Sequence, residues 1–465
     1  MSEAIGEMIL PGTYIDVRAE GLIGVGGIST GNIGIVGTAG KGPVGEVQIL
    51  GSYSEALDMF GSYDRFATTG TPLTLTRALE QVFKGGGSTV YAVRIASGSP
   101  GTMQWSVKGD GAPAPELFKV SAASPGSWAN AMKVTLQDTT LTAELGRVKE
   151  TFTGATAADL VTEIKAGSRL ITAADPADAD KAKAVKSVAV VAANAGSDGA
   201  NVTTTEAKAG LDLLATQAVN IVTVAGMDAK TVGATLLAHL EATENDGRER
   251  LAVVGASSNE VSKIASDDAN ALSNPRVILV APGILSDDAA RTEANKQVKL
   301  PAAFSAALIA GRLSTLAPHI SLTNKDVAAD GLTAEYTRAE QKQLLGNRVL
   351  VLQKNLGIRV LKGITTDTGA FRQISVRRIV DYAKAGVRIG SNPYIGRLNN
   401  SRVRAALKAT LDGFLSGMVL DEMLIAYQLD VTATRSQEIN GIALVTMTLQ
   451  PTFSIDFVKV IMTLS

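Results

Sequence analysis

The sequence predicts a multidomain protein that combines an α/β central domain with an α+β C-terminal domain. Three observations support this fold class. The 465 residues exceed what one compact core usually holds. Strand and helix patterns alternate up to residue 96 and resume after residue 206, so a β-rich inserted outer domain interrupts the α/β domain. Beyond residue 343, two strands, two helices and a final run of strands follow one another, and extended arms are expected at both ends of the chain.

Composition limits the classes of partner. Hydrophobic residues make up 45% of the chain and charged residues only 19%, below the usual level of about 25%. With a formal net charge of −1, the chain offers no bulk attraction to nucleic acid or to a membrane surface, whereas self-association suits such a surface. The absence of cysteine excludes disulfides and thiolate metal sites. Because neither a signal peptide nor an apolar run of about 18 residues is found, we expect a protein made in the cytoplasm, soluble when made and not inserted into a membrane.

Residues 1–20 are expected to form an N-terminal linking arm. Pro11 and Gly12 preclude a helix, and the following residues alternate as in a strand with one apolar face. The apolar face is formed by Thr13, Ile15 and Val17, and Tyr14 begins the opposite face.

The central α/β domain is assigned to residues 21–96 plus 207–342, and the inserted surface domain to residues 97–206. Strands separated by helices imply a largely parallel sheet. Asp228 is the expected N-cap of one helix and Ser54 of another. The expected strands are 32–38, 88–96, 219–224, 250–255 and 276–280, and the expected helices are 54 onward, 76–83, 228–242, 258–272 and 300–316.

The C-terminal domain is assigned to residues 343–465, with strands at 347–352, 358–362 and 425–434. One helix is expected at 375–387, and Asn399 or Asn400 is expected to cap a second helix. The apolar stripe of the second helix consists of Val403, Leu407, Leu411, Phe414 and Met418.

The last 25 residues predict a strand pair, 442–449 and 453–464, whose second strand belongs to a C-terminal arm at 450–465. In the middle of this second strand, the apolar side chains change from one face of the strand to the other. Phe453, Ile455 and Phe457 share one face, whereas Val458, Val460 and Met462 share the other. We expect the inner half to pack on its own domain and the outer half to pack on a neighbouring molecule.

The sequence shows little catalytic equipment. Gly24-x-Gly26 lacks the third glycine of a dinucleotide fingerprint, and Gly40-Lys41 lacks the serine or threonine of a phosphate-binding loop. Only two histidines, His239 and His319, are present, and no metalloprotease or hydrolase motif is found. We therefore predict no catalytic, cofactor-binding or metal-binding residues and no cofactor. An α/β enzyme with an unrecognised active site remains an alternative.

Positive charge is concentrated between residues 371 and 411, where nine basic residues face a single acid, Asp381. Such a run is usually a solvated helix face, but this degree of segregation also favours a surface that docks an acidic partner. DNA is a less favoured partner because aromatic residues are not interleaved with the charges. The residues assigned to the docking surface are Arg397, Arg402, Arg404 and Lys408.

These segments together resemble the sheath proteins of contractile-tailed phages and related contractile injection machines. The similarity is densest in the last 120 residues, in FRQISVRRIVDYAKAGV, NPYIGRLNNSRVRAALKATLDGFLSGMV and VTMTLQPTFSIDFVKVIMTL. PGTYIDV, SPGSWANAMKV and VNIVTVAG are also similar to family segments, whereas residues 140–205 match none. Another structural phage component remains an alternative, although a tube subunit would be smaller and mostly β.

The resemblance implies a homo-oligomer of stacked rings in a helical sheath, located in the virion tail and made in the host cytoplasm. In the family, the two terminal arms add strands to sheets of neighbouring subunits. The other implied partners are an inner tail tube protein, which the basic helix would contact, and baseplate and tail terminator proteins. Contraction of the sheath would drive the tube through a target cell envelope during injection. Whether the particle is a phage, a bacteriocin-like particle or another injection machine stays open.

Overall fold

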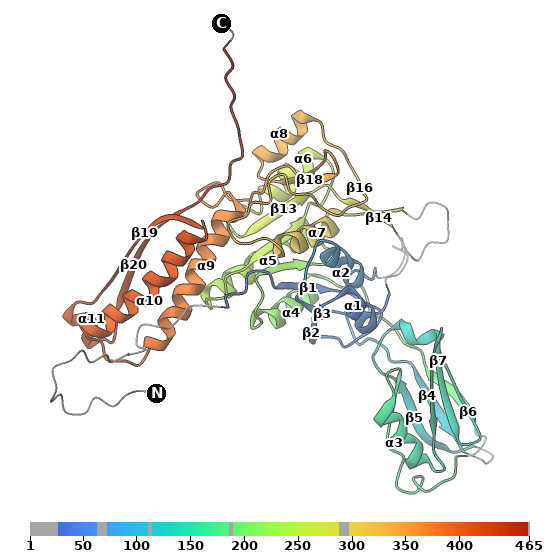
Figure 1. Cartoon of the computed structure of the whole chain (residues 1–465). Coiled ribbons are helices and arrows are strands. Elements are labelled where there is room, and N and C mark those ends of the chain that lie inside the picture. Colours follow the sequence, from blue (N-terminus) through green and yellow to red (C-terminus); the bar gives the residue numbers. More distant parts are fainter. Residues whose placement is uncertain (1–26, 63–71, 110–113, 186–188, 288–296, 464–465) are drawn as a thin grey trace, which may run out of the picture. The chain divides into compact units, whose positions relative to one another are not determined.

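A computed structural model describes residues 27–62, 72–109, 114–185, 189–287 and 297–463 (Figure 1). It divides into two compact units. Of the described residues, the central unit comprises those within Gly31–Thr315 and Asn324–Asp367, and the C-terminal unit comprises 368–463 with Leu316–Thr323 and 27–30. The predicted N-terminal arm, with Thr13, Tyr14, Ile15 and Val17, lies outside the described residues.

An eight-stranded sheet forms the centre of the central unit, in the order β18-β17-β13-β12-β11-β1-β3-β2. All neighbouring strands are parallel except the edge strands β18 and β2, as the alternation of strands and helices predicts. The inner strands are continuous apolar runs because helices cover both faces of such a sheet. The bounds are β1 (Ile33–Gly37), β2 (Val47–Leu50), β3 (Val90–Arg94), β11 (Ile221–Val224), β12 (Leu251–Gly255), β13 (Val277–Ala281), β17 (Leu350–Lys354) and β18 (Ile358–Val360).

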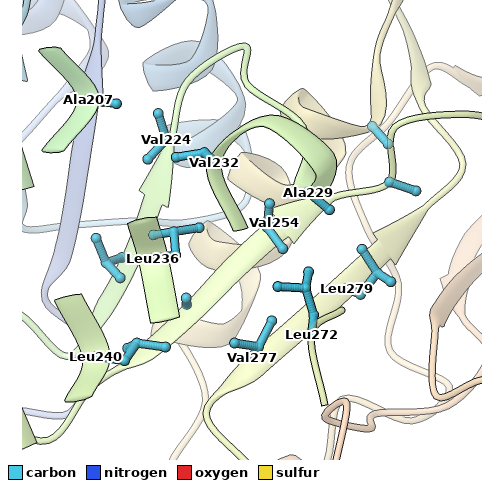
Figure 2. Packing of buried hydrophobic residues seen from close by; sticks show 14 of the residues in the cluster. Ala207, Val224, Ala229, Val232, Leu236, Leu240, Val254, Leu272, Val277 and Leu279 are labelled. Atoms are coloured by element: carbon cyan, nitrogen blue, oxygen red, sulfur yellow. The ribbon is translucent and has the colours of Figure 1, made fainter. Parts of the chain in front are cut away.

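The helices of the central unit supply apolar stripes to this sheet. Asp228 caps α5 as predicted, because its carboxylate accepts a hydrogen bond from the Thr231 amide at 2.9 Å. In Figure 2, Leu236 and Leu240 of α5 lie in the same cluster as Val254, Val277 and Leu279 of the strands. The bounds are α1 (Tyr53–Phe60), α2 (Leu75–Lys84), α4 (Thr204–Ala215), α5 (Ala229–Asn245), α6 (Val261–Lys263), α7 (Ala302–Ser314) and α8 (Arg338–Gly346).

Several local expectations differ from the structure. Ser52 rather than Ser54 caps α1, since its side chain accepts from the Glu55 amide. The predicted helix 258–272 is the short α6 followed by a π-helical turn, Ile264–Ala269. Strands β17 and β18, which the sequence predicts to belong to the C-terminal domain, instead extend the central sheet, because β17 pairs in parallel with β13. The C-terminal unit therefore begins after Asp367 rather than at residue 343.

The inserted segment is β-rich and has its own apolar core, which includes Trp105, Phe118, Leu141 and Leu160. One sheet has the order β10-β4-β5-β9 and another the order β6-β7-β8. A separate small sheet, β15-β14-β16, lies in the second half of the central unit. The bounds are β4 (Gln104–Lys108), β5 (Glu116–Ala122), a 3-10 helix (Ser127–Ala131), β6 (Lys133–Gln137), β7 (Thr140–Leu145), β8 (Val148–Thr153), α3 (Ala157–Gly167), β9 (Ile171–Ala173), β10 (Val190–Asn194), β14 (Ile284–Asp287), β15 (Gln297–Leu300) and β16 (Gly331–Leu332).

The C-terminal unit packs two long helices against a two-stranded sheet. Asn400 caps α10 by accepting from the Val403 amide at 2.9 Å, which decides between the two predicted caps. Gly386 of α9 lies against the ring of Phe414 of α10, where a β-carbon would overlap the ring. The bounds are α9 (Ile374–Ser391), a 3-10 helix (Asn392–Tyr394), α10 (Ser401–Leu420), β19 (Leu424–Thr432), α11 (Arg435–Ile439) and β20 (Leu444–Pro451).

Candidate inter-subunit surface

Strands β19 and β20 form an antiparallel pair that runs from Leu424 opposite Pro451 to Thr432 opposite Leu444. Within the described residues, these strands pair only with each other, so each has one edge without a strand partner. Edges of this kind are templates for an added strand, and a two-stranded sheet is marginal on its own. The pair can therefore accept a strand on either side.

Side chains alternate across this pair. Leu429, Met447 and Leu449 are half-buried and contact the apolar cluster that α9 and α10 share. The opposite face is exposed and largely polar, with Gln428, Asp430, Thr446, Thr448 and Gln450. The helices thus fix which face of an added strand would be apolar.

The segment 452–463, which we call the tail, is extended (Figure 1), and it pairs with no strand of the part of the chain that the structure describes. The predicted strand pair is therefore wrong in its partner, because β20 pairs with the preceding strand β19 rather than with the tail. The inner half does contact its own unit, as expected, but through Ser454 and Asp456. The expected apolar face does not make this contact, since Ile455 and Phe457 are 81% and 83% exposed. The predicted arm residues that are exposed are Phe453, Ile455, Phe457, Val458, Val460 and Met462.

Polar side chains hold residues 452–456, which we call the root of the tail. Ser454 and Asp456 alternate with the exposed apolar residues and are half-buried. Both form hydrogen bonds with Gln373, and Asp456 also accepts one from Thr323. Gln373 and Thr323 could not be predicted from the sequence, because no local pattern relates them to residues 81 and 133 positions further along the chain.

The predicted basic residues have partners within the C-terminal unit. Nη1 of Arg404 lies 3.0 Å from Oε1 of Glu438 and 2.9 Å from Oδ1 of Asn399. Nζ of Lys408 lies 3.3 Å from Oδ1 of Asp430 in a largely exposed pair. Hydrogen bonds from Arg435 and from Arg404 lower the pKa of Glu438.

Arg397 is exposed in the loop before α10, and Arg402 is exposed at the start of that helix. The guanidinium of Arg397 lies over the ring of Tyr394, at 5.3 Å from the ring centroid. Acids from β19 and α11 thus neutralise part of the charge counted between residues 371 and 411. Arg397 and Arg402 point to a cationic surface that is smaller than the sequence suggests.

His239 lies in the interior of the central unit. His239 is buried, and its Nε2 lies 3.1 Å from Nη1 of the buried Arg250. Burial, together with the charge of Arg250, lowers the pKa of His239 to about 4. The described parts of the chain contain no group of three or more histidine or acidic residues placed to hold a metal ion. Of their helices, none is both long and apolar enough to cross a membrane.

Comparison with solved structures shows the fold. The sheath tail protein of Desulfitobacterium hafniense superposes with a TM-score of 0.65 at 17% identity, covering 95% of this chain and 100% of that one. That of Listeria innocua gives a TM-score of 0.66 at 14% identity, covering 94% and 95%. The helical sheath of the anti-feeding prophage in its contracted state gives 0.59 at 14% identity, covering 98% and 99%.

Sequence comparison finds two tail sheath proteins. That of Bacillus phage SP01 is 30% identical over 229 residues, which cover 47% of this chain, and that of Mycobacterium phage Bxz1 is 28% identical over 207 residues, which cover 40%. These matches span only 39% and 34% of the relatives' own lengths. The family model of the phage tail sheath protein central domain matches residues 200–366, and that of the phage tail sheath C-terminal domain matches residues 366–465. Since the two models together match more than half of the chain, this protein belongs to the phage tail sheath family.

Proposed function

We propose that this chain is a structural subunit of a contractile tail sheath, which polymerises helically around an inner tube and contracts to drive the tube through a target cell envelope. The supporting observation is the β19–β20 pair, whose two edges have no strand partner within the described residues, together with the exposed tail in the same unit. Because one molecule carries both the strand edges and the exposed tail, the tail of each copy can pair with an edge of the next copy, and the contact can repeat.

The contact is β-augmentation. The tail of one subunit adds to the β19–β20 pair of a second subunit, and the N-terminal arm, through Thr13, Tyr14, Ile15 and Val17, adds a strand to another neighbour. Main-chain hydrogen bonds give the strength, and the apolar side of the added strand meets the face formed by Leu429, Met447 and Leu449. Such a contact joins unlike surfaces and does not close on itself, so it propagates as a helix.

The tube-facing surface consists of Arg397, Arg402, Arg404 and Lys408. Exposed ion pairs contribute about 0–1 kcal/mol each, so contacts to an acidic inner tube are weak enough to break during contraction. Arg404 contributes less to this surface, because Glu438 and Asn399 already bind its guanidinium. The tube protein, the baseplate and a tail terminator are the proposed partners, and nucleic acid and membrane are not.

Contraction releases free energy stored at assembly. A drop on the order of a few kcal/mol per subunit, summed over many subunits that move as rigid bodies, would drive the tube without a nucleotide. The arms keep neighbours connected while the subunits rotate. The subunit is thus structural rather than enzymatic and acts in the virion tail.

Electron microscopy of the purified chain tests this function. The full chain is expected to form ordered tubules, and a variant that ends at Phe457, which keeps the contacts of Ser454 and Asp456, is expected to stay unassembled while keeping the thermal stability of the full chain. A full chain that never assembles and instead binds a small molecule saturably would favour the enzyme alternative.

A further inference from the structure

The root of the tail has the reverse of the usual arrangement of a docked strand. In an extended chain, alternate side chains point to opposite sides. Here the polar residues Ser454 and Asp456 face their own unit, whereas the apolar residues Phe453, Ile455 and Phe457 face outward. Burial of apolar surface therefore does not hold this segment in place.

Gln373 holds the segment through its side-chain amide. Its Oε1 accepts a hydrogen bond from the Ser454 amide at 3.2 Å, and its Nε2 donates to the Ser454 carbonyl at 3.5 Å. One side chain thus contacts both main-chain groups of Ser454, as a neighbouring strand would do. Nε2 also lies 3.1 Å from Oδ2 of Asp456.

Two further hydrogen bonds complete this hold. The Thr323 hydroxyl donates to Oδ1 of Asp456 at 3.2 Å, so the carboxylate accepts from two neutral donors. The Thr452 amide donates to the Met423 carbonyl at 3.0 Å, directly before β19. These contacts fix residues 452–456, whereas residues 458–463 are exposed.

Gln373 is available for this role because it is not used by its own helix. It occupies the N-cap position of α9 with an extended backbone, yet its side chain makes no capping hydrogen bond. An N-cap is usually serine, threonine, aspartate or asparagine, whose short side chains reach the first turn. The longer glutamine side chain reaches the tail instead.

We infer that Gln373, assisted by Thr323, is a positioning residue that fixes the root of the tail with Phe453, Ile455 and Phe457 directed toward a second copy of this chain, so that the tail pivots after Asp456. This inference rests on the proposed function, because it assumes that the tail binds a neighbouring subunit. A root ordered before binding loses less conformational entropy when the contact forms. Because the hydrogen bonds of Gln373 and Thr323 with the root are only half-buried, they can also break when subunits rotate.

The test compares variants of the full chain. Gln373→Leu keeps the size of the side chain and removes all its hydrogen bonds. Gln373→Glu places a carboxylate beside Asp456, and Gln373→Glu with Asp456→Asn restores a donor–acceptor pair in the opposite sense. Gln341→Leu on α8, where the amide donates to the Tyr336 carbonyl, is the control at another half-buried glutamine.

The first measurement is hydrogen exchange of the unassembled protein. Gln373→Leu and Gln373→Glu are expected to speed exchange at the amides of residues 452–456 by about tenfold, as the loss of about one hydrogen bond implies, while peptides from α9 and β20 keep their rates. The double variant is expected to recover slow exchange. Unchanged exchange in Gln373→Leu would overturn the inference.

The second measurement is the lowest protein concentration at which tubules form. It is expected to rise about tenfold in the two single variants and to recover in the double variant. Faster exchange with normal assembly would overturn the positioning role and leave the proposed function intact. If the unaltered chain forms no tubules, the proposed function fails, and the exchange data alone decide whether Gln373 holds the tail.

Discussion

Arg404 of α10 and Glu438 of α11 form an ion pair in which Nη1 lies 3.0 Å from Oε1, with 15% and 21% of the two side chains exposed. The pair joins the helical layer of the C-terminal unit to the connection between β19 and β20. Its first role is therefore in the stability of that unit, before any contact with a tube.

Replacing Arg404 by methionine tests this role. The change leaves Glu438 without one of its two arginine donors, and we expect the free energy of unfolding to decrease. A double-mutant cycle with Glu438→Gln, measured by urea unfolding, should give a favourable coupling energy between the two residues. Additive effects of the two changes would show that the pair contributes nothing to stability.

Charge reversal at Arg402 and Lys408 tests tube docking. The double change to glutamate is expected to weaken co-sedimentation with assembled tail tubes while tubules of the chain itself still form, since both residues are outside the β19–β20 edges. Lys165→Glu with Lys208→Glu, two exposed lysines of the central unit, is the control. Equal binding by the two double variants would remove the docking role.

Gly386 tests the packing of α9 on α10. Gly386→Ala would place a β-carbon within the ring of Phe414, so we expect a loss of about 1–3 kcal/mol in the free energy of unfolding despite the better helix propensity of alanine. Gly413→Ala on α10, where a β-carbon would meet no atom within 4 Å, should instead stabilise by about 0.5–1 kcal/mol. In a Phe414→Leu background, the sign at Gly386 should reverse. Thermal unfolding of the four variants decides the matter.

The buried pair of His239 and Arg250 predicts a pH dependence. Unfolded His239 binds a proton near its ordinary pKa of 6.5, whereas the folded protein holds the pKa at about 4. The unfolded state thus binds more protons between these values, so stability is full above pH 6.5 and falls as the pH decreases toward 4. The expected loss is on the order of 3 kcal/mol.

His239→Gln is the matched control for this prediction, because glutamine can accept from Arg250 but does not titrate. Urea unfolding at pH 7 and pH 4.5 should show a smaller loss of stability in the variant than in the unaltered chain. Equal losses in both proteins would contradict the assignment of the pH dependence to His239.

The exposed face of the tail should matter for assembly and not for folding. Phe453→Ser with Phe457→Ser is expected to leave the melting temperature of the unassembled protein unchanged, because both side chains are exposed, and to prevent tubule formation. Leu356→Ser, at a side chain that is 93% exposed in the turn between β17 and β18, is the control and should assemble normally. A normal yield of tubules from the tail variant would argue against its role in contact.

The sequence predicts the helices and most central strands because their signals are local. The apolar periodicity of α9 and α10 and the N-caps Asp228 and Asn400 each lie within a few residues. Sheet membership is not local. Strands β17 and β18 look the same in sequence whether they extend the central sheet or begin a new domain, and only the parallel pairing with β13 decides it.

The basic surface and the tail are harder to predict, because their partners also lie far away in the sequence. The charge count assigned Arg404 and Lys408 to a partner, yet their acids lie 34 and 22 residues further along the chain, across an intervening strand or turn. Likewise, the apolar alternation at Phe453, Ile455 and Phe457 indicates a strand with one buried face, but not whether its own unit or another molecule covers that face. The C-terminal unit contacts the polar side of the tail through Gln373, and no sequence pattern marks this residue.

Determination of an assembled tubule by electron cryomicroscopy tests the central claim most directly. We predict that residues 458–463 of one copy lie as an added strand along the edge of the β19–β20 pair of another copy, with continuous main-chain hydrogen bonds. Tubules in which each tail lies on its own subunit, or in which both edges of that pair stay unpaired, would contradict it.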